Sequence, residues 1–146
     1  MSTTLDREEI VRRFQGCIHC SQVVIEQWAD ELDLDMETAM RMAAPLGGGC
    51  FKGDVCGCVT GALLAIGARY GHCEIGDTDG NARMVAKTNE FCRKFAERTG
   101  STICRELTGY DFSKPGQMEE AALSGTLIKK CPEYVNTALE ILDEIM

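Results

Sequence analysis

The segment Gly47–Gly61, with the sequence GGGCFKGDVCGCVTG, decides the fold that we expect for this chain. It is a glycine-rich loop that leads directly into an apolar run and carries three cysteines on the way. We predict a helix over Val55–Tyr70 with Asp54 as its N-cap, because a carboxylate there accepts hydrogen bonds from the free amides of the first turn. Cys56 would then lie in that turn, where those amides and the helix dipole stabilise a thiolate.

This predicted helix has small side chains around most of its surface, which indicates a central position. Small side chains let neighbouring helices approach closely on several sides. We therefore expect the helix to be buried among the others, and Gly71 to end it. The small residues are Gly61, Ala62, Ala65, Gly67 and Ala68.

Helical periodicity and helix-ending residues organise the rest of the chain, and no stretch shows the alternation of a strand. A proline is favoured at the first helical position, which would put Cys131 at the cap of a last helix opening at Pro132. The prediction is an all-α fold, an irregular single-domain bundle over residues 1–146 around the small-residue helix. The other expected helices are Leu5–Asp33, Met36–Ala44 with Asp35 as its cap, Ala82–Arg98, Ile103–Thr108 and Gln117–Lys130.

Composition and charge limit the partners and the compartment that we expect. The formal net charge is −8, which argues against nucleic acid and anionic membranes because both bind basic surfaces. No apolar stretch reaches the roughly 20 residues that span a bilayer, so we expect no membrane insertion. The N-terminal sequence MSTTLDREEIVRRF contains acidic residues and lacks an apolar core, so it does not resemble a secretory signal. We expect a cytoplasmic protein.

The nine cysteines are unusual for a reducing compartment, where thiols do not serve as structural cross-links. Cys56, Cys104 and Cys131 stand at predicted helix starts, and Cys20 lies on the first predicted helix. If these positions converge, four thiolates meet, and their like charges require a cation or oxidation to disulfides. Sites of four cysteines hold [2Fe–2S], [4Fe–4S] or zinc. These four cysteines are therefore our candidate ligands for a metal or cofactor.

The cysteines close to Cys56 receive secondary roles. Cys50 and Cys58 flank it and are candidate resolving thiols or alternative ligands. Cys73 and Cys92, in a loop and on a helix face, have no predicted role.

Cys17 and Cys20 form a CxxC pair and make Cys17 a further alternative ligand. In the middle of a helix the two sulfurs are poorly aimed for a disulfide, which favours core filling by Cys17. The surrounding sequence CIHCS lacks the histidine of CxxCH, so covalent c-type haem attachment is not expected.

The chain resembles a family of small bacterial and archaeal redox-active proteins named for its C_GCAxxG_C_C pattern. The resemblance implies that the four cysteines of the family pattern are Cys20, Cys56, Cys104 and Cys131. Within the family, the second cysteine begins a CGAxxG segment, which corresponds to Cys56–Gly61 here. One residue departs from that segment, because Cys58 stands where it has alanine. The resemblance does not identify a substrate. The similarity runs from about Phe14 to Met146 and rests on CSQVV at Cys20–Val24, GGG at Gly47–Gly49, CGCVTG at Cys56–Gly61, Gly100–Ser101, CREL at Cys104–Leu107, and Cys131.

Three functions remain open from the sequence, and so does the question whether the chain is an enzyme. The first is an electron-transfer or redox protein whose four family cysteines bind an iron–sulfur cluster tuned by helix-end amides. The second is a metal-free thiol–disulfide protein in which Cys56 attacks and Cys104, Cys20 or Cys58 resolves. The third is a structural or sensory module with zinc in the same site. The expected partner is an unidentified redox protein, and the small-residue helices leave room for a homodimer.

Overall fold

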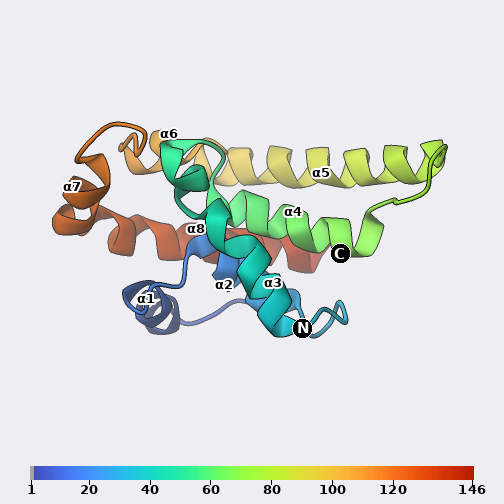
Figure 1. Ribbon diagram of the computed structural model, residues 1–146, viewed down its shortest axis with the longest axis horizontal. Coiled ribbons are helices and arrows are strands. Elements are labelled where there is room, and N and C mark those ends of the chain that lie inside the picture. The colour runs from blue at the N-terminus through green and yellow to red at the C-terminus, as the bar shows by residue number, and fades with distance from the viewer. Residues whose placement is uncertain (1) are drawn as a thin grey trace.

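Helices make up almost all of the regular structure in the computed structural model, which describes residues 2–146 (Figure 1). Over that range the chain forms eight α-helices and no strand, which confirms the all-α prediction. None of the helices within residues 2–146 has both the length and the apolar character needed to cross a membrane. The helices are α1 (Arg7–Gln15), α2 (Cys20–Trp28), α3 (Met36–Ala43), α4 (Gly57–Tyr70), α5 (Thr78–Thr99), α6 (Cys104–Thr108), α7 (Gln117–Ser124) and α8 (Thr126–Ile145).

Helix α4 lies at the centre of the bundle, as its small side chains predict. It packs against α2, α3, α5 and α8, and in Figure 1 it lies between α5 and α8, which run lengthwise beside it. Its inward residues expose at most 1% of their surface, and the core around them includes aromatic side chains of α5 and aliphatic side chains of α8. These core residues are Val59, Ala62, Ala65, Ile66, Phe91, Phe95, Leu139 and Leu142.

Two glycines four residues apart on α4 allow the first turn of α2 to approach closely. A Cβ atom on Gly61 would lie 2.5 Å from the carbonyl oxygen of Ser21. A Cβ atom on Gly57 would collide with the sulfur of Cys20. The Ser21 hydroxyl also donates to the carbonyl of Ala43 at 2.7 Å, which joins this contact to α3. The glycines of the CGCVTG segment are therefore required by helix packing.

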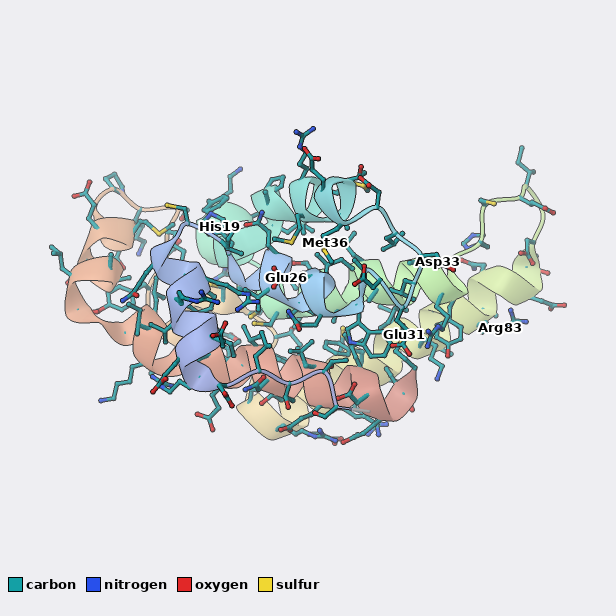
Figure 2. All side chains as sticks on the ribbon, turned by 90° about the horizontal axis from the view of Figure 1, so that it is seen from below. His19, Glu26, Glu31, Asp33, Met36 and Arg83 are labelled. Carbon is teal, nitrogen blue, oxygen red and sulfur yellow. The ribbon has the colours of Figure 1, made fainter. Side chains whose placement is uncertain are left out.

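The single helix predicted over Leu5–Asp33 is wrong, because the chain breaks between α1 and α2. Gly16 ends α1, and Cys17 adopts a left-handed conformation with φ of 68°. A new helix starts at Cys20, where the side-chain oxygen of Gln22 accepts from the His19 amide at 2.9 Å. Figure 2 labels His19 at this break and also Glu26, which joins the two helices by accepting from Arg13 Nε at 2.7 Å.

The predicted helix start at Pro132 is also wrong, because Pro132 lies inside α8, which follows Gly125. A proline inside a helix leaves the carbonyl four residues earlier without its amide donor. That carbonyl belongs to Ile128, and it accepts from the guanidinium of Arg7 at 2.7 Å. The bond from the other end of the chain explains how the helix continues through the proline. Cys131 is consequently not at a helix cap.

Three other helix ends agree with the prediction. Asp35 caps α3 by accepting from the Thr38 amide at 3.0 Å. Gly71 follows α4, and Gly100, with φ of 99°, follows α5. Helix α5 starts one turn earlier than expected, because Asp77 accepts from the Gly80 amide and caps it.

Candidate thiol site

A pocket of about 450 Å³ lies where the starts of α2, α4 and α6 meet the first half of α8. The four cysteines expected to converge all line it: Cys20, Cys56, Cys104 and Cys131. Cys58 lines it as well. The pocket therefore brings these five thiols together from four helices, while the role of the four as ligands stays a prediction.

Cys56 and Cys104 are held side by side by two backbone hydrogen bonds. The Cys56 amide donates to the carbonyl of Thr102 at 2.8 Å, and the Cys104 amide donates to the carbonyl of Asp54 at 2.6 Å. This small antiparallel bridge is the only strand-like pairing within residues 2–146. It fixes the start of α4 against the start of α6, although the two cysteines are far apart in sequence.

The prediction that Asp54 caps α4 is wrong. The helix begins at Gly57, and Cys56 occupies the N-cap position. The Asp54 carboxylate instead accepts from the guanidinium of Arg105 at 3.1 Å, and the same guanidinium donates to the Gly53 carbonyl. Asp54 thus reinforces the contact between the loop and α6.

Cys58 lies between two other thiols. It is 1% exposed, and its thiol makes hydrogen-bonding contacts with Cys20 and Cys56. Its contact with Cys20, then its contact with Cys56 and its burial, raise the pKa of Cys58 well above the ordinary value. The residue that departs from the family pattern therefore joins the thiols of α2 and α4.

The pKa of the Cys20 thiol shifts in the opposite direction, downward. A hydrogen bond donated by Cys58 and further ones from backbone amides, including that of Gly48, lower the pKa of Cys20 to about 7 against the effect of burial. Cys20 is the first residue of α2, so the free amides and the positive end of the helix dipole act in the same direction. A Cys20 thiolate beside a Cys58 thiol is the expected charge state near neutral pH.

Cys104 and Cys131 are held as neutral thiols in the metal-free protein. Burial, followed by the nearby charges of Cys56 and Cys20, raises the pKa of Cys104 to about 12. Burial and the charges of the neighbouring thiols also raise the pKa of Cys131 well above its ordinary value. At Cys104 the increase in pKa caused by burial outweighs the decrease expected from a position at a helix start. Ligation by these two sulfurs would require a cation to displace their protons.

A strained turn before α4 forms part of the pocket wall. Gly48, Gly49, Cys50 and Phe51 all have φ between 58° and 62°, a left-handed conformation that costs a non-glycine residue roughly 1–2 kcal/mol. The turn carries the Gly48 amide that donates to Cys20. It also sets Phe51 edge-on against His19, with ring centroids 4.9 Å apart. Strain of this kind persists only where the surrounding structure enforces it.

The remaining cysteines occupy different positions from these five. Cys17 lines the pocket too, but it is exposed in the turn before α2 and does not fill the core as predicted. Cys50 and Cys73 are exposed and do not line the pocket, and Cys92 is half-buried on α5. From the sequence, Cys50 and Cys58 are equivalent candidates for the site. They differ in the structure because the left-handed turn directs Cys50 away from the pocket.

No group of three or more His, Cys, Asp or Glu side chains in the described part of the chain is arranged to hold a metal ion. A tetrahedral zinc ion needs every sulfur at about 2.3 Å from one centre. The five thiols thus share a pocket without converging on a single point.

The fold and these thiols define a small all-α protein with a thiol-lined pocket. A family model described as "Putative redox-active protein (C_GCAxxG_C_C)" matches residues 18–145, so the chain belongs to this family and the resemblance stated above is confirmed. No curated protein and no solved structure matches the chain.

Proposed function

We propose that the thiol pocket is the redox centre of an electron-transfer protein, in which Cys20, Cys56, Cys104 and Cys131 ligate an iron–sulfur cluster. The observation that carries the proposal is the gathering of these thiols in one pocket of a chain whose family is described as redox-active. Iron–sulfur clusters are held by cysteine thiolates, commonly four.

A cluster places a weaker geometric demand on the four sulfurs than a single ion does. A cluster distributes its four cysteines over two or four irons, so its ligands do not all meet at one point. A zinc ion would require the same sulfurs to move together, since no three of the metal-ligating side chains within residues 2–146 are arranged for an ion. When bound, a cluster supplies one-electron redox chemistry. Zinc remains the alternative that elemental analysis distinguishes.

The protein's own groups would set the reduction potential. Backbone amides of Gly48, Ser21 and Cys20 donate to the Cys20 sulfur, and such bonds stabilise the more negative state. Burial of Cys56 and Cys104 acts in the other direction, because a low-dielectric environment disfavours added negative charge. An electron-transfer partner, as yet unidentified, would approach at the pocket mouth, where Phe51 and Ile128 are exposed.

The test is anaerobic reconstitution of the purified chain with ferrous iron and sulfide. We expect visible charge-transfer absorption and stoichiometric iron and sulfide. Serine substitutions at Cys20, Cys56, Cys104 and Cys131 should each reduce iron content, whereas Cys73→Ser, at an exposed cysteine outside the pocket, should not. Failure to retain iron, or equal retention in all five variants, would contradict the proposal.

A metal-free thiol–disulfide function is the second candidate, and the contact between Cys20 and Cys58 favours it. The Cys20 thiolate would attack a substrate disulfide, forming a mixed disulfide and releasing one substrate thiolate. Cys58, after losing its proton, would attack the Cys20 sulfur and release the second thiolate, so that two electrons pass to the substrate. The contact indicates Cys20 as the attacking sulfur, where the sequence suggests Cys56.

Glutathione buffers of defined ratio test this second function. Peptide mass spectrometry should find a reversible disulfide between Cys20 and Cys58, with no metal present. Cys58→Ala should abolish it, and Cys92→Ala, at a half-buried thiol on α5, should leave it unchanged. The absence of that disulfide at every ratio would remove this candidate.

A further inference from the structure

The thiol pocket has a second component, an apolar wall that the sequence analysis does not predict. Phe14, Ile18, Phe112, Leu127 and Ile128 all line it, although they come from widely separated parts of the chain. Its volume of about 450 Å³ lies within the roughly 300–1,000 Å³ that is usual for small-molecule sites. The pocket therefore has the size and the lining of a site for an organic ligand.

The described lining contains no Asp, Glu, Lys or Arg, although these make up 26% of the residues, and so it offers no cation. Burial lowers the pKa of His19, so its ring is neutral at pH 7. The Tyr134 hydroxyl donates to the Leu107 carbonyl, and the Thr108 hydroxyl donates to the Cys104 carbonyl. A phosphate or carboxylate would find no cation here, which disfavours nucleotide cofactors and indicates an uncharged ligand.

The mouth of the pocket is apolar as well. Seven large hydrophobic side chains are exposed within residues 2–146, and three of them, Phe51, Met118 and Ile128, line this pocket. Phe51 is kept there by the strained left-handed turn. Strain at such a position is retained where the local geometry serves a function.

We propose that this pocket binds an uncharged ring of the quinone and hydroquinone class, seated against its apolar wall beside the thiols. Quinones are organic electron carriers without an obligatory charge, which matches the lining. The choice of a quinone rests on the proposed redox function, whereas the binding of an uncharged ring rests on the pocket alone.

The experiment uses the reduced, metal-free chain and two dyes with the same ring system. N-phenyl-1-naphthylamine is uncharged, and 8-anilinonaphthalene-1-sulfonate carries one sulfonate. We expect saturable fluorescence enhancement at one site with the uncharged dye, and affinity at least about tenfold weaker for the sulfonate, because a buried charge would be unpaired. Tetramethylhydroquinone, which cannot oxidise the thiols, should displace the uncharged dye under argon.

Matched variants locate the site. Ile128→Glu puts a charge on the mouth at a partly exposed position and should weaken binding of the uncharged dye about tenfold. Leu123→Glu is the control, because Leu123 is 89% exposed on α7 and does not line the pocket. Circular dichroism checks that both variants are folded.

Three results would overturn the proposal. These are equal affinity for the two dyes, unchanged binding in Ile128→Glu, and failure of tetramethylhydroquinone to compete. A dimer that Ile128→Glu dissociates in sedimentation velocity, with no dye bound by the wild type, would instead assign this face to self-association. Because no iron is present, the binding result is separate from the reconstitution result, and either proposal can fail alone.

Discussion

The two ends of α4 differ in the kind of contact that surrounds them. At the C-terminal end, Arg69 donates to the Met146 carbonyl at 2.9 Å and Lys87 donates to the Ile145 carbonyl at 2.6 Å, so cations bind the end of α8. Such cations are favourable at a helix C-terminus. At the N-terminal end, the described lining of the pocket contains no Asp, Glu, Lys or Arg and is rich in thiols. The comparison shows that charged contacts and candidate chemistry lie at opposite ends of one helix.

Removing a buried aromatic ring of α5 should have the largest effect. Phe95 is fully buried and stacks on Phe91, with ring centroids 5.9 Å apart. We expect Phe95→Ala to lower the free energy of unfolding by about 3–5 kcal/mol in urea denaturation. Val85→Ala, at a 42% exposed position of the same helix, should change it by less than about 0.5 kcal/mol. Similar losses in both variants would contradict this account of the core.

Glycine substitutions within α4 should distinguish the two ends next. Gly61→Ala forces a methyl group against the Ser21 carbonyl and should lower the free energy of unfolding by about 2 kcal/mol. Gly67→Ala is the control, because its Cβ would meet no described atom within 4 Å, and alanine should stabilise the helix by about 0.5–1 kcal/mol. Urea denaturation measures both changes, and two changes of the same sign would refute the close approach of α2.

Replacing Cys58 by alanine should change the chemistry of the pocket and leave the contacts at the C-terminal end of α4 unaffected. Alanine is the residue of the family pattern at this position. The pKa of Cys20 is lowered to about 7, so its thiolate is present above that pH and lost below it. Without the hydrogen bond from Cys58, the pH at which iodoacetamide alkylates Cys20 at half its maximal rate should rise toward the ordinary value of 9.0. Peptide mass spectrometry of the metal-free protein gives this rate, with the exposed Cys73 as internal control. An unchanged midpoint would rule out Cys58 as the donor.

The smallest effect should come from the charged contacts. Arg69 lies 5.6 Å from the centre of the Trp28 ring and donates to Met146. Because both interactions are near the surface, Arg69→Met should lower the free energy of unfolding by only about 0.5–1 kcal/mol. High salt should reduce the difference between variant and wild type. A loss as large as that of Phe95→Ala would contradict the placement of these two interactions near the surface.

The parts of this fold that could be predicted are those that depend on residues close together in the sequence. The central helix follows from its small side chains, and Asp35 and Gly100 are recognisable as helix ends. The continuation of α8 through Pro132 was not predictable, because it depends on Arg7 bonding to Ile128, 121 residues away. The break before Cys20 was also missed, although Gly16 was the available signal.

The candidate site likewise has a part that could be predicted from the sequence and a part that could not. Its cysteines could be selected from their positions near helix starts and from the family resemblance. The apolar wall could not, because Phe14 and Ile128 come together only through the packing of α1 on α8. The position of Cys58 between two thiols was likewise not evident, since it follows from Gly57 admitting the Cys20 sulfur against α4.

The bonds that join the first residues to α8 have a consequence for synthesis. Leu5 pairs with Asn136 through two hydrogen bonds, and Arg7 reaches Ile128. During translation the first helix leaves the ribosome long before the segment on which it docks. Until α8 emerges, Phe14 has no partner with which to close the pocket wall, and Cys20 and Cys56 are exposed to solvent and to oxidants.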